Sequence, residues 1–204
     1  IRPAPKHMIS ATSKEVVPVR TLLRQSGLMA VLIASVITIT SQDLLTIYMP
    51  LLGADHNINV RDIGGLLTVR SIASLISRMA YVRVIRTMGR QPLTLVSMVG
   101  AGIGFACFAF PIPLAAMYAA MTFLGFSLGI ATTLSLTNVV DLASAAAMGT
   151  VMSLRITGNR IGQVAVPFVA GLVATATGAA GIFAIIAVSL AASGASVHLS
   201  RQER

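Results

Sequence analysis

The chain has 204 residues, of which 55% are hydrophobic and 10% are charged, and its mean hydropathy is +0.86. Since an ordinary soluble domain carries roughly 25% charged residues, this composition excludes a fully water-exposed surface. The formal net charge is +9, but the chain has no Trp and only 5% aromatic residues, and its charges lie beside apolar runs, so we expect no nucleic-acid partner.

Residues 1–26 are predicted to be a basic linker on the cytoplasmic side. A signal peptide is not expected, because no short apolar segment follows a basic start. The chain begins with Ile and not with Met, so we expect it to be a piece of a longer protein. The basic residues of the linker, set against Glu15, are Arg2, Lys6, Lys14, Arg20 and Arg24.

Six apolar segments follow, and each is long enough to cross about 30 Å of hydrocarbon as a helix rising 1.5 Å per residue. A membrane strand would alternate apolar and polar residues, and residues 114–129 show no such alternation. The sequence therefore predicts an all-α membrane protein whose residues 27–204 form a six-helix transmembrane bundle. The predicted spans are 27–51, 63–85, 92–110, 114–139, 148–173 and 180–199.

The distribution of basic residues predicts the topology, because Lys and Arg near span ends are retained in the cytoplasm. They gather in the linker, in the loop between the second and third spans, and in the tail at Arg201 and Arg204. Both ends of the chain are therefore predicted to be cytoplasmic. The expected location is the cell membrane, which in bacteria is the inner membrane.

Polar and ionisable residues inside the first two spans mark a candidate functional site. Each ionisable residue at a helix centre costs about 2.5 to 3.5 kcal/mol on insertion scales, and the first span contains Gln42 and Asp43 while the second contains Arg70. The spans run in opposite directions, which places Asp43 and Arg70 roughly 10 to 12 Å deep. We expect an ion pair, either a static bridge or a charge pair that changes with substrate or proton.

The fifth span carries a polar stripe, because Arg155, Asn159 and Gln163 recur every four residues and share one helix face. Arg160 lies beside them. Such a stripe should face a water-filled cavity or another polar helix, and its cations suggest an anionic solute. The alternative is that Arg155 extends towards the cytoplasm while the two amides bond neighbouring helices.

Pairs of glycines at four-residue spacing predict close contacts between helices. The pairs are Gly100 with Gly104, Gly125 with Gly129, and Gly158 with Gly162.

No catalytic or cofactor motif is convincing. The pattern G-x-S-x-G around Ser127 fits a hydrolase elbow only between a strand and a helix, so an intramembrane hydrolase is a remote alternative. Neither a metal site nor a phosphate-binding loop is found in the sequence, and we expect no cofactor.

The loop after the second span ends in Gly89-Arg90, and the fifth span contains Arg155-x3-Asn159-x2-Gly162. Both segments resemble parts of the C-terminal half of the major facilitator superfamily. Gly89-Arg90 fits the end of the family's D-x-x-G-R loop, although Arg86 stands at its Asp position and Val82 at its first Gly position. Ser77-Arg78 falls where that half often has such a pair. The second match, which resembles the family's eleventh helix, is Arg155-x3-Asn159-x2-Gly162-Gln163-x3-Pro167-x3-Gly171.

The resemblance implies one half of a twelve-helix bundle, in which spans one, two, four and five border a central cavity. The expected function is secondary active transport of a small solute by alternating access, with coupling to protons through a partly desolvated Asp43. The expected partners are the solute, the proton, the lipid bilayer and an N-terminal six-helix half. A non-transporting scaffold and the transmembrane subunit of a nucleotide-driven transporter remain alternatives.

The same resemblance implies a cytoplasmic gate, in which Asp141 pairs with Arg86 or Arg90 in one state of the transporter. The residues predicted for this gate are Arg78, Arg83, Arg86, Gly89, Arg90 and Asp141.

Overall fold

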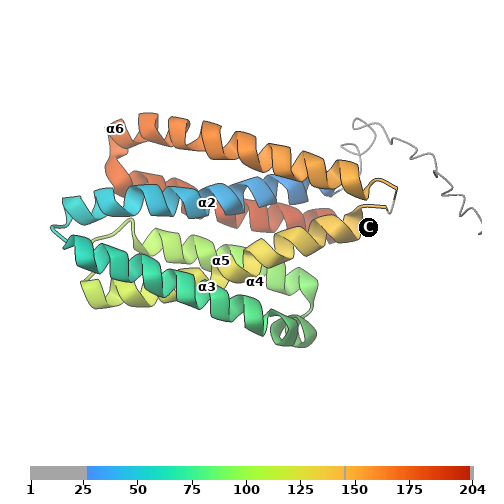
Figure 1. Ribbon diagram of the computed structural model, residues 1–204, viewed down its shortest axis with the longest axis horizontal. Coiled ribbons are helices and arrows are strands. Elements are labelled where there is room, and N and C mark those ends of the chain that lie inside the picture. The colour runs from blue at the N-terminus through green and yellow to red at the C-terminus, as the bar shows by residue number, and fades with distance from the viewer. Residues whose placement is uncertain (1–26, 145, 203–204) are drawn as a thin grey trace, which may run out of the picture.

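The computed structural model describes residues 27–144 and 146–202, and every regular element in these ranges is a helix. The predicted linker, residues 1–26, lies outside the described residues. Figure 1 shows long helices that run side by side. They are α2 (Leu28–Asp55), α3 (Val60–Met88), α4 (Arg90–Cys107), α5 (Leu114–Leu142) and α6 (Met148–Gln202).

The helix α6 consists of two antiparallel arms. Its apolar part alone has 51 residues, which would extend about 75 Å at 1.5 Å per residue, far beyond the thickness of a bilayer. The backbone leaves helical geometry at Gly178, with φ 66° and ψ −171°, and the chain then returns along the bundle (Figure 1). We call residues 148–177 the first arm and residues 179–202 the second arm. A positive φ is one that glycine adopts without steric penalty.

Four of the described helices are long and apolar enough to cross a membrane, namely α2, α3, α5 and α6. The six predicted spans are therefore supported only in part. The helix α4 has 18 residues and begins with Arg90, Gln91 and Pro92, so its apolar part is shorter than the roughly 20 residues that a full span needs. The helix α2 continues to Asp55 and α3 starts at Val60, because helical hydrogen bonding extends past the apolar segment that hydropathy detects.

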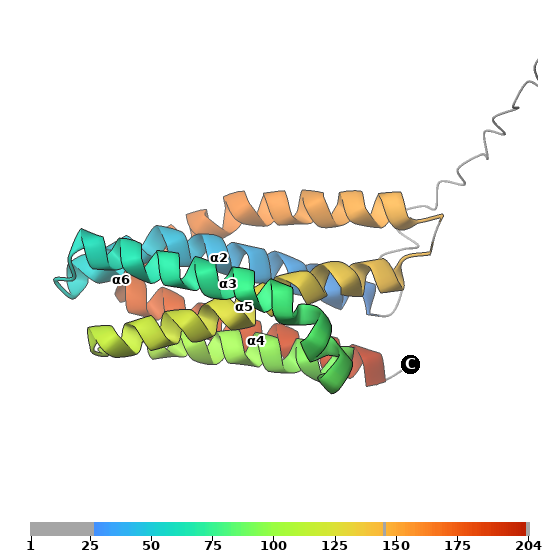
Figure 2. The same cartoon turned by 60° about the horizontal axis from the view of Figure 1, so that its bottom comes forward.

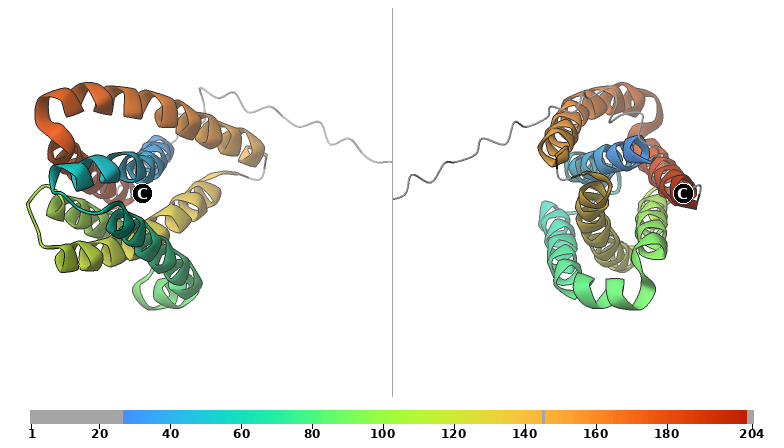
Figure 3. Two further views of the ribbon diagram at one scale, coloured as in Figure 1. Left: turned by 60° about the vertical axis from the view of Figure 1, so that its left-hand side comes forward. Right: turned by 90° about the vertical axis from the view of Figure 1, so that its right-hand side faces the viewer.

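The packing places α2 and α5 in the middle of the bundle. The helix α2 packs against α5 and α6, α5 also packs against α3 and α4, and α4 packs against α6. Figure 2 shows α4 beside α5, and the end-on view in Figure 3 shows α3 and α4 on opposite sides of α5. The second arm of α6 stacks on α4 through Phe183 and Phe105, whose ring centroids are 6.0 Å apart.

The predicted glycine contacts are confirmed. A Cβ atom at Gly129 would lie 2.8 Å from the carbonyl oxygen of Ser74 in α3, so this glycine allows the α3 and α5 backbones to approach closely. At Gly162 a Cβ atom would lie 3.1 Å from the Thr40 side chain of α2, and at Gly104 it would lie 2.6 Å from Leu124 of α5.

Two apolar clusters fill the bundle at its two ends. One contains Leu45, Phe105 and Phe183, and the other contains Leu28 and Val139. On α2, the stretch between the clusters carries hydroxyl side chains and then the polar pair that the sequence analysis selected. The buried hydroxyl residues of this stretch are Ser35, Thr38, Thr40 and Ser41.

Candidate functional site

A hydrogen-bonded chain of three polar side chains joins the middle of α2 to the middle of the first arm of α6. The Gln163 Nε2 atom donates to Asp43 Oδ2 at 2.9 Å, and the Arg160 Nη1 atom donates to Gln163 Oε1, also at 2.9 Å. Asp43 lies twelve residues before the end of α2 at Asp55, which is about 18 Å along the helix. Asp43 therefore lies farther from the end of its helix than the sequence predicted.

The predicted ion pair between Asp43 and Arg70 is wrong for this structure. Among the described residues, the carboxylate of Asp43 accepts from Gln163, and no atom of Arg70 lies within ion-pair distance of it. The physical reason is the packing, because α2 lies mainly against α5 and α6 whereas α3 lies mainly against α5. Arg70 interacts with Asp43, and also with Arg78, only through longer-range electrostatics.

Gln42 joins α2 to α5 at the same level. We call the side chains linked here, which are Asp43, Gln163, Arg160, Gln42 and Thr132, the polar layer. Its Nε2 atom donates to Thr132 Oγ1 at 2.8 Å, and the Thr132 hydroxyl donates in turn to the Leu128 carbonyl oxygen at 2.6 Å. Thr132 was missed in the sequence, because a threonine in an apolar helix usually bonds its own backbone. The signal that could have found it is the amide of Gln42, which needs a polar partner on a facing helix.

A polar groove of about 300 Å³ opens between α2 and α3 beside this layer. Arg78 lies in this groove and not in the predicted gate, because α3 continues for ten residues beyond it to Met88. The Nε atom of Arg70 is buried without a hydrogen-bond partner among the described residues. The groove is lined by Gln42, Arg70, Ser71, Ser74, Leu75 and Arg78.

The predicted stripe of α6 does not face a single cavity. Asn159 is buried and its Oδ1 atom accepts from Ser35 Oγ at 3.2 Å, so this amide bonds a neighbouring helix. Arg155 is half-buried and lines a groove made mainly by apolar residues of α2, such as Leu32 and Ile33. Of the stripe, only Gln163 and the adjacent Arg160 join the polar layer around Asp43.

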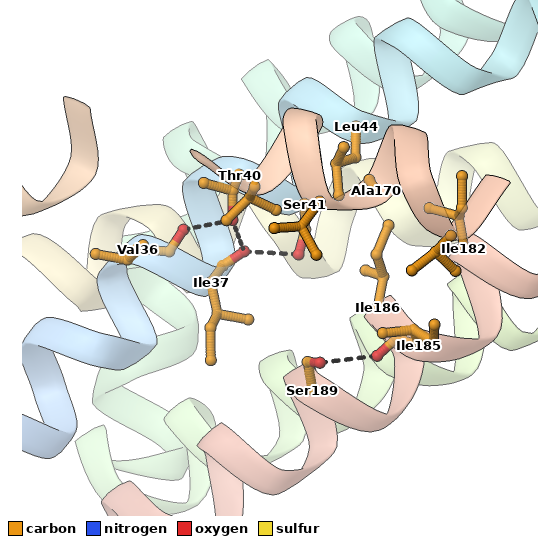
Figure 4. Close-up of a pocket in the computed structure, with 13 residues that line it drawn as sticks. Val36, Ile37, Thr40, Ser41, Leu44, Ala170, Ile182, Ile185, Ile186 and Ser189 are labelled. Atoms are coloured by element: carbon orange, nitrogen blue, oxygen red, sulfur yellow. Dashed lines mark hydrogen bonds between the residues drawn. The ribbon is translucent and has the colours of Figure 1, made fainter. Parts of the chain in front are cut away.

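A second hollow, of about 200 Å³, lies between α2 and both arms of α6 (Figure 4). Its lining is apolar apart from hydroxyl groups, and these donate to carbonyl oxygens of their own helices. Ser41 donates to Ile37 at 2.6 Å and Ser189 donates to Ile185 at 2.8 Å. Among the described residues, no charged or amide side chain lines this hollow, so it lacks the oriented polar groups by which a site recognises a polar solute.

The ion pair predicted for Asp141 forms with Arg90, which joins the end of α5 to the start of α4. Beneath it, Asn138 Nδ2 donates to Thr94 Oγ1 at 3.2 Å, and Thr94 Oγ1 donates to the Arg90 carbonyl oxygen at 2.8 Å. This buried pair was not predicted from the sequence. Gly89, with φ 77°, is the single residue between α3 and α4, and we call this end of the bundle the Gly89 end.

The other predicted gate residues, Arg83 and Arg86, are exposed on the last turns of α3, and neither forms an ion pair within the described part of the chain. Ser127 lies inside the continuous helix α5 and is 8% exposed. It therefore does not occupy a turn between a strand and a helix, as a hydrolase elbow would require.

The family model described as Major Facilitator Superfamily matches residues 31–203, which covers α2 to α6 almost completely. No curated protein matches the chain.

Proposed function

Since the chain belongs to the Major Facilitator Superfamily and is a multi-pass membrane transporter, we propose that it forms the C-terminal six-helix half of a secondary transporter that works by alternating access. The observation that carries the proposal is the polar layer at the middle of the helices. It contains the chain Arg160–Gln163–Asp43 and the bond between Gln42 and Thr132. Binding sites of such transporters lie near the bilayer midplane, between two repeats.

The exposure of α3 supports a missing partner half. Arg70 is only partly covered and Arg78 and Ser71 are exposed, although they lie at the depth of the hydrocarbon in a membrane-spanning helix. Polar side chains at this depth face protein or water rather than lipid. An N-terminal six-helix half that closes over this face, with a cavity between the halves, satisfies the requirement.

We further propose that Asp43 carries the coupling proton. Its carboxylate bonds Gln163 across the contact between α2 and α6, so protonation would weaken a charge-assisted hydrogen bond between two helices. A change of charge at that contact can favour one of two arrangements of the helices. Asn159 and Arg155 are left out of the pathway, because the first bonds Ser35 and the second lines an apolar groove.

The Arg90–Asp141 pair supports a gate at the Gly89 end. The two side chains are 47% and 37% exposed, so the pair contributes little stability, about 0 to 1 kcal/mol, and can open without a large free-energy change. The basic residues at this end, among them Arg83 and Arg86, favour the cytoplasmic side for it. The proposed location is therefore the cell membrane, with both ends of the chain in the cytoplasm.

Proton coupling is tested with the full-length protein in vesicles, by recording the pH of a weakly buffered medium when a solute is added. Succinate, hydrogen phosphate, acetate and glucose are added one at a time. For a transported solute we expect a pH change with the unaltered protein and none with Asp43→Asn, while counterflow exchange of the labelled solute continues. A pH change of full size with Asp43→Asn would remove the proton role of this residue.

A further inference from the structure

One face of α3 carries Arg70, Ser74 and Arg78 at four-residue spacing, so the three side chains project from the same side of the helix. Ser74 is the central residue of the helix, with fourteen residues before it to Val60 and fourteen after it to Met88. Each arginine therefore lies about 6 Å from the helix centre along its axis. We call these three residues the α3 triad.

The charges of Arg70 and Arg78 have no carboxylate partner in the described ranges 27–144 and 146–202. These ranges contain four acidic residues. Asp141 pairs with Arg90, and Asp43 is joined to Arg160 through Gln163. The other two, Asp55 and Asp62, lie at the opposite end of the bundle, where α2 ends and α3 begins.

The environment of the α3 triad favours an anionic ligand. Arg78 repels the Arg70 guanidinium group, and the longer-range attraction of Asp43 offsets this repulsion only in part. The Nε atom of Arg70 is buried and has no hydrogen-bond partner among the described residues. Leaving a buried donor unsatisfied costs free energy that a hydrogen-bond acceptor would recover. Gln42 and Ser71 line the same groove and add polar groups beside the cations.

We propose that the α3 triad binds a compact dianion, such as a dicarboxylate or hydrogen phosphate, as the transported solute. Two negative charges match the two arginines, neither of which has an ion-pair partner among the described residues. The planar fork of a guanidinium group matches carboxylate and phosphate oxygens with two parallel hydrogen bonds. The groove of about 300 Å³ is at the small end of ligand sites, which favours a compact solute. This assignment rests on the proposed function, because the groove must open to water on each side of the membrane in turn.

The inference is tested by equilibrium binding to the full-length transporter in lipid nanodiscs, measured by isothermal titration calorimetry. The probes are succinate, hydrogen phosphate, acetate and glucose. We expect one of the two dianions to bind at least about tenfold more tightly than acetate, with no binding of glucose. Arg70→Gln and Arg78→Gln should each weaken that binding about tenfold or more, since each removes charge-assisted hydrogen bonds.

Arg155→Gln is the matched control. The Nε atom of Arg155 is also buried without a hydrogen-bond partner among the described residues, but Arg155 lines the apolar groove between α2 and α6. This change should leave dianion affinity unaltered. If a Gln variant does not fold, the Lys variant keeps the charge without the fork and should still bind several-fold more weakly. Failure of both dianions to bind, or equal weakening by Arg155→Gln, would overturn the inference. The binding measurement uses no gradient across a membrane. A failure of transport or of proton coupling would therefore not alter the measured affinity, and the two proposals can be tested separately.

Discussion

The bond between Asp43 and Gln163 gives the sharpest test of how the polar layer is held together. Gln163→Leu keeps the approximate volume of the side chain but removes the donor that lies 2.9 Å from Asp43 Oδ2. Hydrogen bonds to charged groups contribute about 1.5 to 3 kcal/mol. Since Asp43 is only half-buried and water screens part of its charge, we expect a loss near the lower limit, about 1.5 kcal/mol.

A double-mutant cycle with Asp43→Leu isolates the interaction from other effects of each change. The free energy of unfolding is measured by circular dichroism in mixed detergent micelles. The coupling energy between Asp43 and Gln163 should be about 1.5 kcal/mol, whereas the coupling between Asp43 and Arg70, which make no direct contact, should stay below about 0.5 kcal/mol. A coupling with Arg70 as large as that with Gln163 would refute the description of the polar layer.

Two further changes test the packing and the gate. Gly129→Leu should lower the free energy of unfolding by about 1 to 3 kcal/mol, because a Cβ at this position would lie 2.8 Å from the α3 backbone. Gly64→Leu is the control and should not lower it, because the space around Gly64 is open. Equal losses of stability in the two variants would contradict the close α3–α5 contact. Arg90→Gln and Asp141→Asn should each lower the free energy of unfolding by less than about 1 kcal/mol. Both changes should nevertheless speed the labelling, from the cytoplasmic side, of a cysteine that replaces Ser71. An unchanged labelling rate would exclude a gating role for the pair.

The sequence predicted the parts of the structure that depend on local patterns. The glycine at 129 marks a close helix contact, because the four-residue spacing of small residues is visible in the sequence. The pairing of Asp141 with Arg86 or Arg90 was expected from the resemblance to the family, and the structure selects Arg90. Both features depend on the order of residues along one or two neighbouring helices.

The partners within the polar layer could not be predicted, because they depend on which helices lie side by side. Asp43 and Arg70 are predicted at similar depths in the membrane, so the sequence permits an ion pair between them. In the structure α2 packs on α6, and Gln163 donates a hydrogen bond to the Asp43 carboxylate. Arg78 was assigned to the gate because Ser77-Arg78 resembles a pair of the family's loop region, but ten residues of α3 separate it from the end of the helix at Met88. The site was found in outline, and its connections required the fold.

Alternating access requires that the polar groove beside α3 opens to each side of the membrane in turn. Ser71, exposed on the rim of the polar groove, is replaced by Cys in the full-length transporter with Cys107→Ala. In sealed vesicles, a membrane-impermeant thiol reagent is then applied from either side. Labelling of the cysteine at Ser71 from both sides, while a cysteine at Asn57 reacts only from outside and one at Thr87 only from inside, is the predicted result. Labelling at Ser71 from one side alone, with and without solute, would contradict alternating access.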